Sequence, residues 1–96
     1  MPKAYWVACY RQITDPAKLA AYGTRAAPAI EAAGGPFLAR ANAAHAYEAG
    51  RLERTVIIEF GSIEKAAACH DGAAYQAALK ALDGGAIRDV RIVPGL

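Results

Sequence analysis

The sequence contains few of the features that mark the more easily recognised classes of protein. Its 96 residues include two cysteines, Cys9 and Cys69, which form no CxxC pair and predict small buried thiols. The charged residues are scattered singly, and a formal net charge of +2 is too small to indicate nucleic-acid binding. No hydrophobic run approaches the length of a membrane span, and MPKAYWVACYRQ at the start lacks the apolar core of a secretory signal. We therefore expect a cytoplasmic protein with reduced thiols and with neither nucleic acid nor membrane as a partner.

Motifs for common cofactors and nucleophiles are also missing. The chain has no P-loop, GxGxxG, GxSxG or HExxH pattern. Its histidines, His45 and His70, fall on different predicted elements without the spacing of metal ligands, and no further cysteine or histidine cluster supports them. The sequence therefore predicts no metal, no haem and no other cofactor.

What the sequence does contain is a high proportion of small apolar residues. Hydrophobic residues make up 55% of the chain, but much of this is alanine, which adds little apolar area per residue. The length fits one domain, residues 1–96, with a single small core. We expect some apolar surface to be left over for a partner.

The first third of the chain predicts a strand followed by a helix. Residues 4–12, AYWVACYRQ, are aromatic and branched with apolar groups on both faces, which is typical of a central strand. Asp15 and Pro16 together form a helix start, because the carboxylate can accept from free backbone N–H groups and the proline needs none. Pro28 interrupts the helical hydrogen bonds, so we predict a kink or short break over residues 24–27.

The middle of the chain predicts a hairpin. The Gly34–Gly35 pair ends the first helix, since glycine tolerates the left-handed conformation found there. Residues 36–49, PFLARANAAHAYEA, have no further breaker and predict a long strand. A turn at Gly50 leads into residues 53–60, ERTVIIEF, the clearest strand in the chain.

The last third predicts a helix and a closing strand. Ser62 can cap a helix that is interrupted at Asp71–Gly72 and then resumes an apolar stripe from Tyr75 onward. Residues 86–93, AIRDVRIV, form the last strand, which gives the order βαββαβ. Two right-handed helical crossovers then place both helices on one face of a four-stranded antiparallel sheet. Because nothing remains to cover the other face, we predict a homodimer that packs sheet against sheet.

These segments resemble a known family in order and in detail. The motifs that carry the likeness are Tyr5-Trp6, the TDP turn at 14–16, Gly-Gly before FLAR, the EAG turn, and RTVIIEFGS over 54–62. Together they are similar to the domain of unknown function 1330, within the dimeric α+β barrel superfamily. The resemblance implies an α+β, ferredoxin-like βαββαβ monomer whose sheet pairs with a second copy to form a barrel. It implies no established activity, although superfamily relatives include cofactor-free monooxygenases, lactone isomerases and haem enzymes.

The chain also departs from the pattern of that family. Members tend to show Arg-Gly-Gly after FLA, where this chain has Arg40 followed by Ala-Asn, and a Trp-Tyr-x-Ser-x-x-Tyr motif, where it has Cys69-His-Asp-Gly and then Tyr75. Arg40 and Tyr75 match. Because Cys69 fills much less volume than an indole, we hypothesise a changed or larger cavity beside it.

Arg40 is the centre of the predicted site. Strand periodicity places it on one face with Asn42 and Glu48, and turns His45 to the other face unless a bulge shifts the register. One interpretation is a structural ion pair with Glu59 of the neighbouring strand. In the other, Arg40 binds a carboxylate or enolate oxygen in a pocket. The candidate ligand-binding residues are Arg40, Asn42, Glu59, Tyr10, Tyr22, His70 and Tyr75.

Two functions remain open from the sequence. The first is a homodimeric protein that binds a small acidic or aromatic metabolite. The alternative is a cofactor-free enzyme of the monooxygenase or isomerase type, in which Arg40 stabilises an oxyanion and His70 or a tyrosine moves a proton. The sequence assigns no catalytic residue and does not decide between the two.

Overall fold

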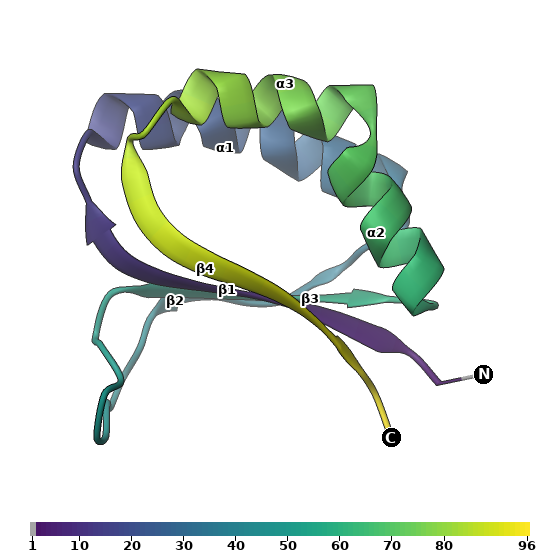
Figure 1. Ribbon diagram of the computed structural model, residues 1–96, viewed down its shortest axis with the longest axis horizontal. Coiled ribbons are helices and arrows are strands. Elements are labelled where there is room, and N and C mark those ends of the chain that lie inside the picture. The colour runs from purple at the N-terminus through teal and green to yellow at the C-terminus, as the bar shows by residue number, and fades with distance from the viewer. Residues whose placement is uncertain (1) are drawn as a thin grey trace.

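The computed structural model describes residues 2–96 and shows an α+β fold of the ferredoxin-like type (Figure 1). The strands are β1 (Ala4–Ile13), β2 (Phe37–Asn42), β3 (Arg54–Phe60) and β4 (Ala86–Pro94). The helices are α1 (Pro16–Ala32), α2 (Ile63–Asp71) and α3 (Ala73–Leu82). The strands form one antiparallel sheet in the order β2-β3-β1-β4, and all three helices cover the same face of it (Figure 1). The predicted fold is therefore confirmed, with β1 in the interior of the sheet.

The two predicted helix starts are both present and capped as expected. The Asp15 carboxylate accepts from the backbone N–H groups of Ala17 and Lys18, at 3.0 and 3.2 Å. The Ser62 hydroxyl accepts from the N–H of Lys65 at 3.1 Å. Short polar side chains thus satisfy donors that have no partner inside the helix.

Helix α1 continues without a break through Pro28, so the break predicted over residues 24–27 is not found. A proline removes the hydrogen bond to the carbonyl four residues earlier, which here belongs to Thr24. Both residues are exposed, so that carbonyl lies on the side of the helix that faces solvent. The interruption at Gly72 is real, because its extended backbone separates α2 from α3 and turns the second predicted helix into two.

The second strand is much shorter than predicted. It ends at Asn42, which pairs with Arg54, the first residue of β3, so the chain beyond this pair has no strand to bond to. Residues 43–53 form a loop that projects on the side of the sheet opposite the helices (Figure 1). His45 and Glu48 lie exposed on this loop, and the assignment of either to a strand face was wrong.

A bulge in β2 changes which of its residues face the helices. Phe37 pairs with Ile58, but Arg40 pairs with Val56, so one extra residue lies between the two pairs. Paired residues of an antiparallel sheet share a face, and Val56 and Ile58 are buried under the helices. Phe37 and Arg40 therefore lie on the same face, although simple alternation placed them on opposite ones.

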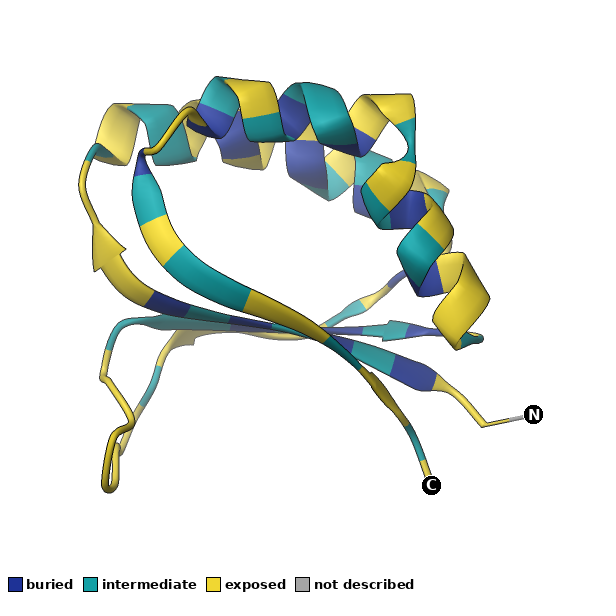
Figure 2. Ribbon diagram, in the orientation of Figure 1, coloured by how far each residue is buried: buried dark blue, intermediate teal, exposed yellow. Residues whose placement is uncertain are grey.

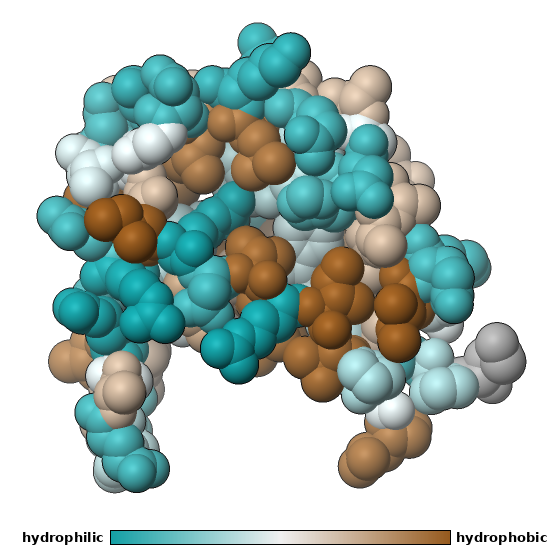
Figure 3. All heavy atoms as spheres, viewed as in Figure 1, coloured by the Kyte–Doolittle hydropathy of each residue, from teal (hydrophilic) through white to brown (hydrophobic). Residues whose placement is uncertain are grey.

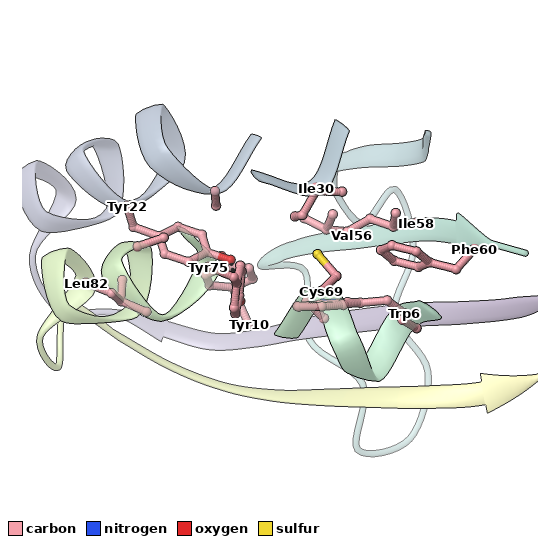
Figure 4. Close-up of a cluster of buried hydrophobic side chains, with 14 residues drawn as sticks. Trp6, Tyr10, Tyr22, Ile30, Val56, Ile58, Phe60, Cys69, Tyr75 and Leu82 are labelled. Carbon is pink, nitrogen blue, oxygen red and sulfur yellow. Dashed lines mark hydrogen bonds between the residues drawn. The ribbon is translucent and has the colours of Figure 1, made fainter. Parts of the chain in front are cut away.

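The hydrophobic core fills the space between this face and the helices (Figures 2 and 4). Its largest fully buried side chains are Trp6, Ile58, Phe60 and Tyr75. The Trp6 and Tyr75 rings meet edge to face with centroids 4.9 Å apart, which joins β1 to α3. Within residues 2–96, no helix combines the length and hydrophobicity needed to cross a bilayer.

The opposite face of the sheet has no helix over it (Figure 1). In β1 this face carries Tyr5, Val7 and Cys9, and Val7 pairs across the sheet with Ile57 on one side and Arg91 on the other. Beside the loop, the face is hollowed into a cavity of about 510 Å³. Within residues 2–96, this face therefore carries half-buried apolar side chains next to exposed charged ones.

Candidate functional site

A cavity of about 310 Å³ lies between α1 and the covered face of the sheet. Its walls are mostly apolar, because small residues of α1 face the alanine and branched side chains of the central strands. The polar exceptions include two tyrosines and three arginines. The residues that line it are Trp6, Ala8, Tyr10, Pro16, Leu19, Ala20, Tyr22, Gly23, Ala26, Ala27, Ile30, Phe37, Arg40, Arg54, Val56, Ile58 and Arg88.

Arg88 of β4 joins three tyrosines at one side of this cavity. Its guanidinium donates to the hydroxyls of Tyr10 and Tyr22, each at 3.2 Å, and to that of Tyr75 at 3.0 Å. Tyr10 comes from β1, Tyr22 from α1 and Tyr75 from α3, and their rings converge in the core (Figure 4). Arg88 pairs directly with Tyr10 across the sheet, which fixes the direction from which it approaches.

The charge of Arg88 has no carboxylate partner within the described chain. Rings and hydroxyls surround it instead, with Cζ 4.6 Å from the Tyr22 ring centroid and 5.3 Å from that of Tyr10. Burial opposes the charge, but the tyrosine oxygens outweigh this and hold the pKa of Arg88 above its ordinary value. The three tyrosine contacts use at most three of the five guanidinium N–H groups.

Tyr10 and Tyr22 are held in their protonated form. Burial raises the pKa of Tyr22 and of Tyr10 above the ordinary value, and the nearby Arg88 offsets this only in part. The hydroxyls of Tyr22 and Tyr75 are 2.8 Å apart, so one donates to the other. Tyr75 is fully buried and does not line the cavity, whereas Tyr22 does. If Tyr75 donates to Tyr22, the proton of Tyr22 is free for a group inside the cavity.

Two further arginines line the cavity from the β2 and β3 side. The Arg40 guanidinium lies over the Phe37 ring at 4.4 Å, which the bulge makes possible by placing both on one face. Arg54 is half-buried at the start of β3. No lining residue among residues 2–96 is acidic. The cavity therefore combines apolar walls with cationic groups, which suits an organic anion.

Not all of the predicted site residues come together here. Tyr10, Tyr22 and Arg40 line the cavity, and Tyr75 contacts it through Arg88. Asn42 is exposed near the end of β2 and does not line it. Glu59 lies on the opposite face of the sheet and pairs with Lys3 at 3.1 Å, so the predicted Arg40–Glu59 pair was wrong.

His70 lies outside the cavity. Its Nδ1 is 2.9 Å from the Asp71 carboxylate, and its ring lies 5.3 Å from Tyr75 and 5.7 Å from Trp6, measured between centroids. Cys69 also does not line the cavity, and its Sγ lies 4.0 Å from the carbonyl oxygen of Ala29. A cavity beside Cys69 therefore stays a hypothesis, distinct from the cavity beside Arg88. In the part of the chain that the structure describes, no three His, Cys, Asp or Glu side chains form a metal site.

Arg88 and Arg54 are the two site residues that the sequence analysis missed. A signal for Arg88 was available, because alternation along AIRDVRIV places it on the same face as Val90 and Ile92. An arginine on the apolar face of a strand needs a partner or a ligand. Arg54 carried no comparable signal, since it stands beside Glu53 at a strand end.

The fold and this site define a ferredoxin-like α+β protein with an arginine–tyrosine cavity between sheet and helices. The chain belongs to the family described as "Domain of unknown function (DUF1330)", whose model matches residues 3–96. No curated protein matches the chain.

Solved structures with the same fold share little sequence with this chain. A protein of unknown function from Rhodopseudomonas palustris has a TM-score of 0.71 and 18% identity, over 97% of this chain and 80% of that one. SnoaB, a cofactor-independent oxygenase from Streptomyces nogalater, has a TM-score of 0.62 and 14% identity, over 96% and 91%. A dimeric ferredoxin-like protein of unknown function from Thermobifida fusca has 0.55 and 12%, over 97% and 91%. At these identities the likeness shows the fold alone.

Proposed function

We propose that this protein binds a small organic anion with an apolar, ring-sized body in the cavity beside Arg88. The observation that carries the proposal is a guanidinium in a largely apolar cavity, held by three tyrosine hydroxyls and by no carboxylate of residues 2–96. Arg88 is half-buried, and a partly desolvated charge without a counter-charge is unfavourable, so a carboxylate or enolate oxygen that reaches it is stabilised. Arginine also matches the planar geometry of a carboxylate.

Calorimetric titration with benzoate at neutral pH tests this proposal. Benzoate combines a carboxylate for Arg88 and Tyr22 with a ring for the apolar walls, and we expect it to bind the wild-type protein. Arg88→Met keeps a long apolar side chain but removes the charge, and we expect at least a tenfold loss of affinity. Arg25→Met, on the exposed surface of α1, is the matched control and is expected to bind as the wild type does. Equal affinity in the wild type and in Arg88→Met would contradict the proposal.

We also propose that two copies pair through the face of the sheet that the helices leave open. That face carries half-buried apolar side chains, and a second copy would cover it with a surface of the same composition. The Thermobifida fusca neighbour is described as dimeric, which supports the proposal for this chain. A native mass spectrum that contains only monomer at micromolar concentration would contradict it.

A cofactor-free enzyme is the second candidate, and one observation favours it. Arg88 and Tyr22 line the same cavity, and both can donate hydrogen bonds to an oxyanion there. We therefore propose Arg88, in place of Arg40, as the residue that stabilises the oxyanion. No lining residue within 2–96 is a carboxylate or a histidine that could accept a proton. A substrate would therefore have to arrive already ionised.

SnoaB is described as a cofactor-independent oxygenase, so oxygen uptake is the reaction to measure first. The assay would follow dissolved oxygen in the presence of a polyphenol that is ionised at the working pH. Uptake that depends on protein and is lost in Arg88→Met would establish an enzyme. Binding without uptake would leave the protein as a binding module.

A further inference from the structure

We infer that the ligand of this cavity is a dianion, with an apolar ring between two acidic groups. This inference rests on the proposed function and deepens it. Its basis is the number and placement of the arginines, since Arg88, Arg54 and Arg40 all line one cavity of about 310 Å³. None of the three forms an ion pair within residues 2–96.

The sheet register places two of these arginines on opposite sides of Tyr10. Arg88 pairs with Tyr10 from β4, and Cys9 pairs with Thr55, which sets Arg54 of β3 at the level of Tyr10 on its other side. Arg54 is close enough to Tyr10 to lower its pKa, against the larger raising effect of burial. With strands roughly 4.8 Å apart, the two arginine Cα atoms are separated by roughly 10 Å.

Arg40 adds charge on the side of Arg54. It pairs with Val56, two residues beyond Arg54 on the same face, so both guanidinium groups belong to the β2–β3 side of the cavity. Between this pair and Arg88, the floor of the cavity is formed by Tyr10, which lies between Arg54 and Arg88, and by apolar side chains that include Ala8 and Val56. The arrangement is thus cationic at two ends, with an aromatic ring and apolar side chains between them.

A ligand with one acidic group would leave one end of this cavity without a counter-charge. A second carboxylate at the half-buried Arg54 and the exposed Arg40 supplies it through charge-assisted hydrogen bonds. The roof contributes to the fit, because α1 presents the small residues Ala20, Gly23 and Ala27, which leave room for a flat ring. The chemical class is therefore an aromatic or alicyclic dicarboxylate.

The test compares benzoate with its ortho, meta and para dicarboxylate analogues by calorimetry at neutral pH, where all are ionised. These probes share one ring and differ only in the second charge and its direction. We expect at least one dicarboxylate to bind ten times more tightly than benzoate. The ratio of the two affinities should fall to near one in the double variant Arg40→Met/Arg54→Met, while Arg25→Met keeps the wild-type ratio.

The outcomes separate this inference from the proposed function. Benzoate binding with no gain for any dicarboxylate would overturn the dianion and leave the anion site intact. A gain that survives in a folded double variant, checked by thermal unfolding, would also overturn it. Binding of none of the four acids would overturn both proposals.

Discussion

At the scale of single residues, Arg88 and the tyrosines that contact it determine the charge that the cavity presents to a ligand. Arg88 is charged and the hydroxyls of Tyr10 and Tyr22 are neutral at physiological pH, because burial raises the pKa of these two tyrosines more than Arg88 lowers it. The cavity therefore offers hydrogen-bond donors and a positive charge to an anion, and it offers no proton acceptor of ordinary basicity.

The stability of the protein should fall above the ordinary pKa of tyrosine, which is 10.0. The folded-state pKa of Tyr22 is raised, so its contribution is fully present below pH 10 and is lost as the pH rises toward the folded value. We expect the free energy of unfolding in urea to drop from pH 8 to pH 10.5, and to drop less in Tyr22→Phe. Tyr47→Phe, at a side chain 78% exposed, should follow the wild type. Identical pH profiles in all three proteins would show that Tyr22 is not coupled to folding.

Site residues could be predicted from the sequence where the periodicity of their own strand or helix determines which way they face. Tyr10 and Tyr22 were recognised as donors because aromatic residues at helical and strand spacing point into a core. Arg40 was predicted as a pocket residue and it lines the cavity, but period two placed it on the face opposite Phe37, whereas the bulge puts both on one face. Alternation along β4 marked Arg88 as a charge on an apolar face, but its three partners lie on β1, α1 and α3, and no local pattern shows that they meet there.

At the scale of whole elements, the connection from α1 to β2 is closely packed against the core. A Cβ added to Gly35 would lie 2.7 Å from Cζ of Phe60 and 3.0 Å from Cγ2 of Ile58, both buried side chains. The backbone of this connection must therefore pass directly over the core.

Gly35→Ala should lower the free energy of unfolding by roughly 1–3 kcal/mol, as overpacking of a core does. Gly23→Ala is the contrasting variant, because it lies inside α1 with no atom within 4 Å of the added Cβ. There the helix propensity of alanine should raise stability by up to about 1 kcal/mol. Urea unfolding of both variants measures the difference. A Gly35→Ala protein as stable as the wild type would contradict the close approach to Phe60.

The predicted element boundaries were correct where capping residues fix a helix end. They were wrong in the alanine-rich stretch after β2, where no residue marks the end of the strand. Asp15, Ser62 and Gly72 each determine a helix end through their own backbone or side-chain chemistry, and each was predicted correctly. Residues 43–49 are mostly alanine with no branched residue, so nothing in them favours a strand once the partner ends at Arg54. The long second strand rested only on the lack of a breaker.

At the scale of the whole molecule, the sheet has the cavity on one face and the proposed dimer interface on the other. Hydrophobic surface is visible along the side of the molecule where β4 runs (Figure 3), and Val93 at the end of that strand is 44% exposed. Such surface in a small protein is typical of an interface.

Ile57→Asp should weaken the proposed dimer without unfolding the monomer. Ile57 lies on the open face and not in the core, so an aspartate there meets water in the monomer and an apolar surface in the dimer. We expect a dissociation constant at least tenfold higher by analytical ultracentrifugation, with an unchanged far-ultraviolet circular dichroism spectrum. Ala74→Asp, exposed in the first turn of α3, is the control and should assemble as the wild type does. Equal dissociation constants for the two variants would exclude this face as the interface.

Alternation along β3, β4 and the part of β1 up to Tyr10 gives each of these strands two differently used faces. Here the even-numbered residues, such as Tyr10, Val56 and Arg88, lie on the face of the cavity and core, and their odd-numbered neighbours lie on the open face. A substitution at an even-numbered position such as Val56 therefore changes the cavity and leaves the open face as it is, and a substitution at an odd-numbered position such as Ile57 does the reverse. Tyr10 is an exception, because it lines the cavities on both faces. If both proposals hold, ligand choice and dimer assembly can evolve almost independently in the same three strands.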